Sequence, residues 1–236
     1  MSDFKIGCDI LALFAISDPH LSLSSNKPMD VFGEMWTDHH LKLQHNWNQK
    51  VGPGDTVLVA GDISWAMKLE EAMADLDFIH SLNGKKVFIK GNHDYWWGAI
   101  TRLNRLYDDM VFLQNTFYPY KDYGICGTRG WASIDGTEEH DEKIYKRELM
   151  RLEASIKSAL KEGYKKLIIM MHYPPVTRIS RSGEFLELLE GYNVELLIYG
   201  HVHYDAKEIC INGIYNNIKY ICTSADIIGF DPIRLL

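Results

Sequence analysis

The sequence predicts an α/β domain in which sheets and helices form layers, and three observations lead to this prediction. Short apolar runs typical of buried strands alternate with segments of helical period. Elsewhere strands follow one another without an intervening helix. Five of the strands end abruptly in polar clusters, and open α/β sheets place their ligands at the carboxyl ends of strands.

The first half of the chain is expected to supply three strands, each a short apolar run. These runs are 10–17, 55–60 and 86–90. A helical pattern is expected after each strand, over 30–49, 69–82 and 97–106. The breakers "VGPGD" and "NG" predict where the first two helices end.

The second half begins with strands and then returns to alternation. "MVFLQNTF" and "YGICGT" predict two strands joined by "YPYKD", which can pair antiparallel because no helix separates them. The longest helix is expected over 137–161, with Thr137 as its cap and Gly163 as its stop. "KLIIMM" and "VELLIY" are then expected to be strands on either side of a short helix at 183–189.

The end of the chain is expected to form a hairpin. "KEICINGIYNNIKYICTSADII" alternates in the manner of two strands, with a turn near Gly213 or at Asn216 and Asn217. The apolar tail "DIIGFDPIRLL" can either pack on the core or contact a partner. The chain has no internal repeat or convincing linker, so a single domain over 1–236 is predicted.

Composition limits the partners and the cellular location. The chain is 46% hydrophobic and 24% charged, with a net charge of -7, which argues against binding nucleic acid or an anionic membrane through a general basic field. "ILALFAIS" near the start is too short to cross a bilayer and lacks a cleavage pattern, so a core strand is the better interpretation. The cysteines are few and widely separated, and we expect reduced, buried thiols in a cytoplasmic protein: Cys8, Cys126, Cys210 and Cys222.

The polar clusters at the strand ends together supply a metal-binding set. They are "DPH" at 18–20, "GD" at 61–62, "GNHD" at 91–94, "MHYPP" at 171–175 and "YGHVH" at 199–203. Any one of them alone is also compatible with an ordinary turn. Carboxylates, imidazoles and a carboxamide without thiolates suit Mn, Fe or Zn, and the number of donors fits two ions best. A two-metal site is suited to the hydrolysis of phosphate esters.

The ordered set of five blocks resembles the calcineurin-like metallophosphoesterases. The pattern of that family is D-x-H, GD, GNH(D/E), H and GHxH, and all five blocks occur here in order over residues 18–203. One block would be weak evidence, whereas the complete series is specific. The resemblance implies a four-layer αββα fold, with two central mixed sheets flanked by helices and a binuclear metal centre at the strand ends.

The resemblance also implies which side chains hold two divalent or trivalent ions. The ligands implied for the first metal are Asp18, His20 and His203. Those implied for the second metal are Asn92, His172 and His201, with Asp62 bridging the two ions. His93 would not be a ligand but would face the leaving-group oxygen, as a general acid or a phosphate contact, and Asp94 would orient it.

One departure from the family pattern bears on the substrate. The protein Ser/Thr phosphatases extend the second block to Asp-Arg-Gly, whereas this chain has "GDISWAM". A phosphate-binding arginine would have to come from elsewhere, and the alternative for each candidate is a solvated surface residue: Arg129, Arg178 and Arg181. Four tryptophans can either line a substrate pocket or pack in the core: Trp65, Trp96, Trp97 and Trp131.

The sequence thus predicts a metal-dependent phosphohydrolase acting on a small-molecule or nucleotide phosphoester. The absence of Asp-Arg-Gly and of a capping domain favours a phosphodiesterase or a nucleotide-type substrate. The alternatives are a phosphomonoesterase and a catalytically weak, metal-binding interaction scaffold of the same fold. The natural substrate, the native metal and the oligomeric state are left open by the sequence.

Overall fold

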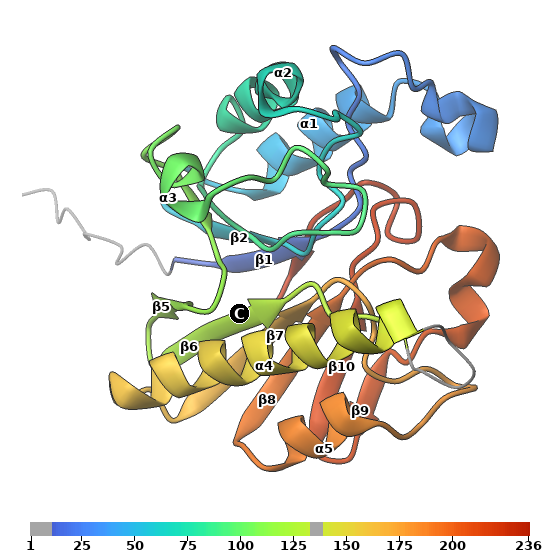
Figure 1. Ribbon diagram of the computed structural model, residues 1–236. Coiled ribbons are helices and arrows are strands. Elements are labelled where there is room, and N and C mark those ends of the chain that lie inside the picture. Colours follow the sequence, from blue (N-terminus) through green and yellow to red (C-terminus); the bar gives the residue numbers. More distant parts are fainter. Residues whose placement is uncertain (1–10, 133–138) are drawn as a thin grey trace, which may run out of the picture.

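Two mixed sheets lie face to face at the centre of the molecule, with helices on their outer sides (Figure 1). The computed structural model describes residues 11–132 and 139–236. The strand order is β11-β1-β2-β3-β4 in the first sheet and β5-β6-β7-β8-β10-β9 in the second. This arrangement confirms the predicted α/β fold with two mixed sheets flanked by helices.

The first sheet is parallel except at one edge. Its strands are β1 (Leu13–Ile16), β2 (Thr56–Val59), β3 (Lys85–Phe88), β4 (Met110–Phe112) and β11 (Ile233–Arg234). The first four pair in parallel, and β11 pairs antiparallel with β1 through Phe14 opposite Arg234. The apolar tail therefore completes the edge of this sheet, which decides between the two alternatives that its sequence left open.

The second sheet combines a parallel centre with a hairpin at each edge. Its strands are β5 (Phe117–Tyr120), β6 (Tyr123–Thr128), β7 (Lys166–Met171), β8 (Val194–Tyr199), β9 (Gly213–Tyr215) and β10 (Ile218–Cys222). Strands β6, β7, β8 and β10 pair in parallel, while β5 and β9 pair antiparallel with their neighbours. The last hairpin turns at Asn216 and Asn217, both of which have positive φ as a tight two-residue turn requires.

The helices cover the outer face of each sheet. Helices α1 (His39–Lys50) and α2 (Leu69–His80) lie on the first sheet, and α4 (Glu139–Lys161) and α5 (Glu184–Glu190) lie on the second (Figure 1). The short helix α3 (Ile100–Leu103) occupies only the centre of the predicted 97–106 segment. The expected cap of α4, Thr137, lies outside the described residues.

Alternation along the central strands builds three apolar layers. In β1, Leu13 and Ala15 face the space between the two sheets, whereas Phe14 and Ile16 face the helices, because successive side chains point to opposite faces. The layer between the sheets is completed by residues such as Leu58 from the first sheet and equivalent ones from β7 and β8. Burial on both faces explains why these strands are continuous apolar runs rather than alternating ones.

Two sequence predictions of elements were wrong. The 30–49 segment is not one helix but two turns of 3-10 helix, η1 (Met29–Phe32) and η2 (Glu34–Trp36), followed by α1. Gly33, with φ of 120°, separates the two turns in a conformation that favours glycine. "MVFLQNTF" does not form one strand, because β4 joins the first sheet while β5 joins the second.

The described cysteines agree with the expected thiols. Cys126, Cys210 and Cys222 are free and buried, whereas Cys8 lies outside the described residues. In the part of the chain that the structure describes, no helix is both long enough and apolar enough to cross a membrane.

Candidate metal centre

The residues of the five sequence blocks meet at one edge of the two sheets. Each follows the carboxyl end of a strand: Asp18 and His20 follow β1, Asp62 follows β2, Asn92 follows β3, His172 follows β7, and His201 and His203 follow β8. Because β1, β2 and β3 are parallel, as are β7 and β8, their carboxyl ends emerge on the same side. Backbone hydrogen bonds join the ends of the two sheets, as from Ser17 N to Thr223 O at 2.8 Å.

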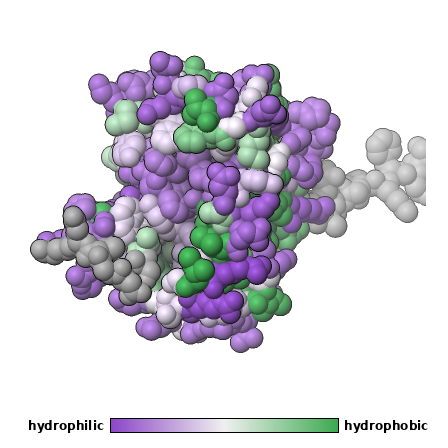
Figure 2. Space-filling model, turned by 90° about the vertical axis from the view of Figure 1, so that its right-hand side faces the viewer, coloured by the Kyte–Doolittle hydropathy of each residue, from purple (hydrophilic) through white to green (hydrophobic). Residues whose placement is uncertain are grey.

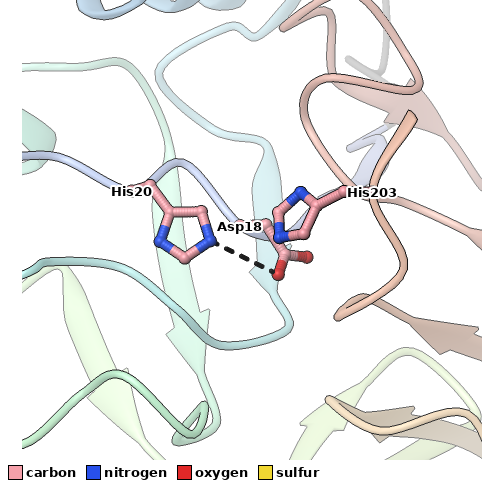
Figure 3. A group of neighbouring side chains, drawn as sticks. All are labelled: Asp18, His20 and His203. Atoms are coloured by element: carbon pink, nitrogen blue, oxygen red, sulfur yellow. Dashed lines mark ion pairs between the residues drawn. The ribbon is translucent and has the colours of Figure 1, made fainter. Parts of the chain in front are cut away.

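A first group of donors consists of Asp18, His20 and His203. One ligand atom of each lies within 4.8 Å of the others. Figure 3 shows these three side chains close together, and a dashed line joins Nε2 of His20 to Oδ1 of Asp18, which are 3.9 Å apart. All three donors come from loops rather than from regular structure. Asp18 and His20 are buried, so bulk water does not reach their side chains.

Asp62 lies between this group and the remaining donors. Its Oδ2 is 3.7 Å from Nε2 of His20 and 3.3 Å from Nε2 of His172, while its Oδ1 accepts a hydrogen bond of 2.8 Å from the backbone N–H of His93. Asp18, Asp62 and His172 form a second group within 4.8 Å. One carboxylate oxygen thus faces two imidazoles from opposite sheets.

Asn92 connects the second sheet's two histidines. Its Oδ1 lies 2.7 Å from Nε2 of His172 and 3.0 Å from Nδ1 of His201. Nδ1 of His172 is 3.0 Å from the carbonyl oxygen of Ala60, an acceptor to which that nitrogen donates. The Nε2 lone pair of a neutral His172 would then face the oxygens of Asn92 and Asp62, so this position requires a cation, either a proton or a metal ion.

The pKa values of the histidines agree with that requirement. Burial alone would lower the pKa of His172, but Asp62 and Asp18 outweigh it and raise the pKa to about 9. Burial lowers the pKa of His20 and that of His201 to about 3, so both rings are neutral and offer a lone pair. Nδ1 of His20 is buried and has no hydrogen-bond partner among the described residues. The donor set therefore fits metal ions.

Two glycines permit the close approach of the backbone to the carboxylates. A Cβ at Gly91 would lie 2.1 Å from Oδ1 of Asp62, and a Cβ at Gly200 would lie 2.2 Å from Oδ2 of Asp18. Both distances are too short for any other residue. The glycines of the "GNHD" and "GHVH" blocks thus serve the packing of the acidic residues.

Four side chains of the centre sit on strained backbone. Their φ angles are positive: 55° at Asp18, 45° at His20, 52° at Asp62 and 68° at His201. Such conformations cost roughly 1 to 3 kcal/mol each for residues other than glycine and concentrate at functional sites. The surrounding hydrogen bonds hold them, since Asp18 N donates to Gly61 O at 2.9 Å and His20 N donates to Asp62 O at 3.0 Å.

No hydrogen bond joins Asp94 to His93 among the described residues, and the role of Asp94 in orienting His93 stays a prediction. Its buried carboxylate accepts backbone N–H groups from Gly91 at 2.7 Å, Asp62 at 3.0 Å and Ile63 at 2.8 Å. Ser64 N and the indole Nε1 of Trp96 donate to it as well. These donors already occupy the carboxylate, and they tie the loop after β2 to the loop after β3. Burial, together with the charge of Asp62, raises the pKa of Asp94 to about 7.

His93 lies beside the donors but at the wall of an open cavity. Its ring centre is 5.7 Å from that of His20 and 4.2 Å from the ring of Trp65. Nδ1 of His93 is buried and has no hydrogen-bond partner within the described chain, and burial lowers the pKa of the ring. The residue itself lines the cavity, so its ring can contact a bound molecule.

Asp226 is a member of the centre that sequence reasoning missed. Its Oδ2 lies 3.1 Å from Nδ1 of His203 and accepts a hydrogen bond of 2.9 Å from the backbone N–H of Tyr204. A carboxylate that accepts from one ring nitrogen leaves the other nitrogen free to bind a metal and fixes the ring orientation. The available signal was "TSAD", a polar cluster directly after the strand β10, like the five that were recognised.

The three candidate arginines have structural partners. Nε of Arg178 donates to Cys210 O at 3.0 Å, and the guanidinium of Arg181 lies 5.9 Å from the ring centre of Tyr215. Arg129 stacks 4.5 Å from the ring centre of Trp131 and lies 3.7 Å from Glu148, although its Nε and Nη2 are without hydrogen bonds in the described chain. None of the three lines the cavity beside His93.

The tryptophans divide between the two expected roles. Trp96 and Trp97 are buried in the core between the first sheet and its helices. Trp65 lines the cavity beside His93, and Trp131 lines a second cavity that includes His201. Core packing is therefore confirmed for Trp96 and Trp97, while the lining of a substrate pocket by Trp65 and Trp131 stays a prediction.

Comparisons with known proteins agree with this geometry. The model of the calcineurin-like phosphoesterase family matches residues 11–205. The Gene 66 protein of Mycobacterium phage D29 is 31% identical over 99 residues, which are 42% of this chain and 46% of the phage protein. The match thus spans about half the length of that relative.

Two solved structures share the fold over nearly the whole chain. A protein of unknown function from Aquifex aeolicus is 19% identical with a TM-score of 0.50, and the match covers 95% of each chain. The phosphopantetheinyl hydrolase from Mycobacterium tuberculosis is 15% identical with a TM-score of 0.55, again over 95% of each chain. At these identities the likeness concerns the fold.

Proposed function

Because this chain belongs to the calcineurin-like phosphoesterase family of metal-dependent hydrolases, we propose that it hydrolyses a phosphodiester at a binuclear metal centre. The observation that carries the proposal is the position of Asp62, whose Oδ2 faces His20 at 3.7 Å and His172 at 3.3 Å. A carboxylate in this position can be shared by two cations and reduce their mutual repulsion. We take the domain that carries this function to extend over 1–236.

The first proposed ligand set is the first group of donors, and the second combines His172 of the second group with its neighbours Asn92 and His201. The first metal would be held by Asp18, His20 and His203, and the second by Asn92, His172 and His201, with Asp62 shared between them. The oxygen and nitrogen donors suit Mn, Fe or Zn, and the absence of thiolates among them argues against a structural zinc site. We propose manganese as the first ion to test.

Bound ions in this centre would lower the pKa of water and neutralise the charge that develops on the phosphoryl oxygens. The side chains of the protein fix the geometry. The carbonyl of Ala60 holds Nδ1 of His172, and Asp226 holds Nδ1 of His203, so each ring presents Nε2 to the centre. Asp94 holds the loops that carry Asp62 and Asn92 at a fixed separation.

His93 is proposed to serve the leaving group. Its position in the cavity wall supports a role as the proton donor or hydrogen-bond donor to the leaving oxygen. The N–H of its backbone donates to Oδ1 of Asp62 and so fixes the loop on which the ring sits. The ring also packs against Trp65, which would help to orient it.

We favour a diester over a monoester because the second block lacks a phosphate-binding arginine. A phosphomonoester carries one more negative charge, and the chain has "GDISWAM" where the protein phosphatases have Asp-Arg-Gly. The phosphopantetheinyl hydrolase with the same fold is, by its name, a hydrolase of a phosphopantetheinyl group. Phosphomonoesters and the role of a metal-binding interaction scaffold are the alternatives that the experiment must separate.

The test compares p-nitrophenyl mono- and diesters with added manganese, before and after chelation. We expect chelator-sensitive turnover that favours the diester. Asp62→Asn should lose metal at the second position and nearly all turnover, whereas Asp108→Asn, which changes an exposed aspartate elsewhere, should behave as the unchanged protein. Full activity in Asp62→Asn would contradict the mechanism. Bound metal without turnover of either ester would favour the scaffold.

A further inference from the structure

A cavity of about 250 Å³ opens directly beside the first group of donors. One wall consists of proposed site residues, and the other residues that line it are mostly apolar or aromatic. The site residues are His20, His93 and His203, and the apolar and aromatic residues are Met29, Phe32, Met35, Trp36, Trp65 and Tyr204. The cavity is therefore continuous with the metal centre.

The apolar wall comes mainly from the segment that sequence analysis misassigned. The turns η1 and η2, drawn in blue at the upper right of Figure 1, contribute Met29, Phe32, Met35 and Trp36. Phe32 is 66% exposed, which leaves a large apolar side chain at the mouth of the cavity without protein cover. Figure 2 shows a face of the molecule that is largely hydrophilic, with hydrophobic residues gathered mainly in its lower half.

Trp65 lines the cavity and also contacts two histidines of the proposed site. Its ring stacks on His20, with centroids 4.9 Å apart and planes inclined by 20°, and it lies 4.2 Å from the ring of His93. A group that leaves from phosphorus on the side of His93 would therefore enter the cavity and contact Trp65. Because His93 is proposed to serve the leaving group and lies in the cavity wall, the cavity would hold the leaving group. The substituent that stays on phosphorus would lie elsewhere.

The charges of the lining disfavour an anionic leaving group. Apart from the three histidines of the site, the ionisable residues that line the cavity are Asp205 and Asp226, and both are carboxylates. Lys27, whose Nζ lies 5.7 Å over the ring of Trp65, is not among them. The volume is below the roughly 300 to 1,000 Å³ of sites for drug-sized ligands, so it suits one or two rings rather than a whole nucleotide.

We propose that this cavity is a leaving-group subsite and that the substrate carries an uncharged, apolar leaving group of one or two aromatic rings. The inference rests on the proposed phosphodiesterase function, which it deepens by naming the substrate class. It differs from the nucleotide-type substrate that the sequence favoured, because the further phosphates of a nucleotide would meet Asp205 and Asp226.

The test uses methyl aryl phosphodiesters and the manganese-loaded full chain. Phenol and 2-naphthol are leaving groups of similar acidity but different area, so kcat/KM for the 2-naphthyl ester should exceed that for the phenyl ester by about 10-fold or more. The 4-carboxyphenyl ester has the better leaving group, yet it should react more slowly than the phenyl ester. Equal rates for naphthyl and phenyl esters would overturn the subsite.

Variants locate the effect. Phe32→Ala should reduce the naphthyl-to-phenyl ratio several-fold, whereas Val31→Ala, an adjacent residue that is 71% exposed and does not line the cavity, should preserve it. Asp205→Asn should raise kcat/KM for the 4-carboxyphenyl ester selectively. An unchanged ratio in Phe32→Ala, with an unchanged melting temperature, would contradict the proposal.

A binding measurement separates this inference from the proposed function. Calorimetric titration with methyl 2-naphthylmethylphosphonate and with dimethyl phosphate should show tighter binding of the naphthyl compound, with the difference reduced in Phe32→Ala. Selective binding of the naphthyl compound without turnover of any ester would contradict the phosphodiesterase function but support an apolar binding site. Turnover of the esters without naphthyl selectivity in rate or binding would contradict the leaving-group subsite but support the phosphodiesterase function.

Discussion

Asp226 and His203 are joined by a hydrogen bond of 3.1 Å from Nδ1 of the imidazole to Oδ2 of the carboxylate. The relationship links the loop after β8 to the segment after β10, so it brings the end of the chain to the metal centre. Burial alone would lower the pKa of His203, but Asp226 and Asp18 raise it above the ordinary value. His203 thus presents its Nε2 to the first group in a fixed orientation.

Asp226→Asn should weaken manganese binding at the first position by about 10- to 100-fold, the usual cost of removing the partner of a ligating histidine. The amide can still pack in the same space, so the melting temperature without metal should change little. Titration calorimetry with manganese measures the effect. Asp231→Asn is the control because Asp231 forms an exposed ion pair with Lys50 and lines neither donor group. Equal affinities in the two variants would remove Asp226 from the centre.

His93→Ala should keep both metals and slow the hydrolysis of esters with poor leaving groups most. A group that donates a proton or hydrogen bond to the leaving oxygen matters least where that oxygen is already stable as an anion. A plot of log kcat against the acidity of the leaving group should therefore steepen. His45→Ala, in the exposed part of α1, provides the control. Equal slowing across the series would argue against this role.

Gly91→Ala should reduce both metal binding and stability. The added Cβ would lie 2.1 Å from Oδ1 of Asp62, which must move away from His172 and His20 to relieve the clash. Overpacking of this kind costs about 1 to 3 kcal/mol in unfolding free energy. Gly98→Ala is the matched control because a Cβ there meets nothing within 4 Å. Urea denaturation and metal titration of both variants measure the two effects, and normal metal binding in Gly91→Ala would contradict the close approach.

Asp109 stabilises the fold through the buried cation of Lys86. Nζ of Lys86, whose side chain is fully buried, lies 2.7 Å from Oδ2 of Asp109, and His80 contacts the other carboxylate oxygen at 2.7 Å. Asp109→Asn leaves the lysine charge without its partner and should cost roughly 2 to 3 kcal/mol at pH 7, below the range for fully buried pairs because water reaches Asp109. Asp122→Asn removes the exposed ion pair with Lys166 and should change stability little.

The stability that Asp109 contributes should depend on pH. Burial would raise its pKa, but the hydrogen bonds with Lys86 and His80 outweigh burial and lower the pKa in the folded state below the ordinary 3.8. A lowered folded pKa means that the contribution is fully present from about pH 5 upward, above the unfolded pKa, and is lost as the pH falls through the folded pKa. The difference in unfolding free energy between the unchanged protein and Asp109→Asn should therefore be constant near neutral pH and shrink in acid. A difference that grows in acid would contradict this pairing.

The sequence by itself determined the fold class and which residues meet at the strand ends. Each block is local, since an apolar run ends and a carboxylate, amide or imidazole follows within a few residues. The parallel alignment of β1, β2 and β3 then places the ends of these runs side by side, so Asp18, Asp62 and Asn92 gather without any further information. The turn at Asn216 and Asn217 was one of the two positions that the sequence offered, because the geometry of a turn depends on its own residues.

Only the tertiary structure decided what the remaining side chains contact. Asp94 was expected beside its neighbour His93, but its carboxylate accepts N–H groups from the loop after β2, about thirty residues away along the chain. Asp226 reaches His203 only because β10 lies beside β8 in the second sheet. The segment 29–36 has an amphipathic helical pattern, yet Gly33 divides it into two turns that form the wall of a cavity. Local sequence patterns predict which residues are buried and where a strand ends. The hydrogen-bond partner of a polar group depends instead on which segments the packed sheets bring within hydrogen-bond distance.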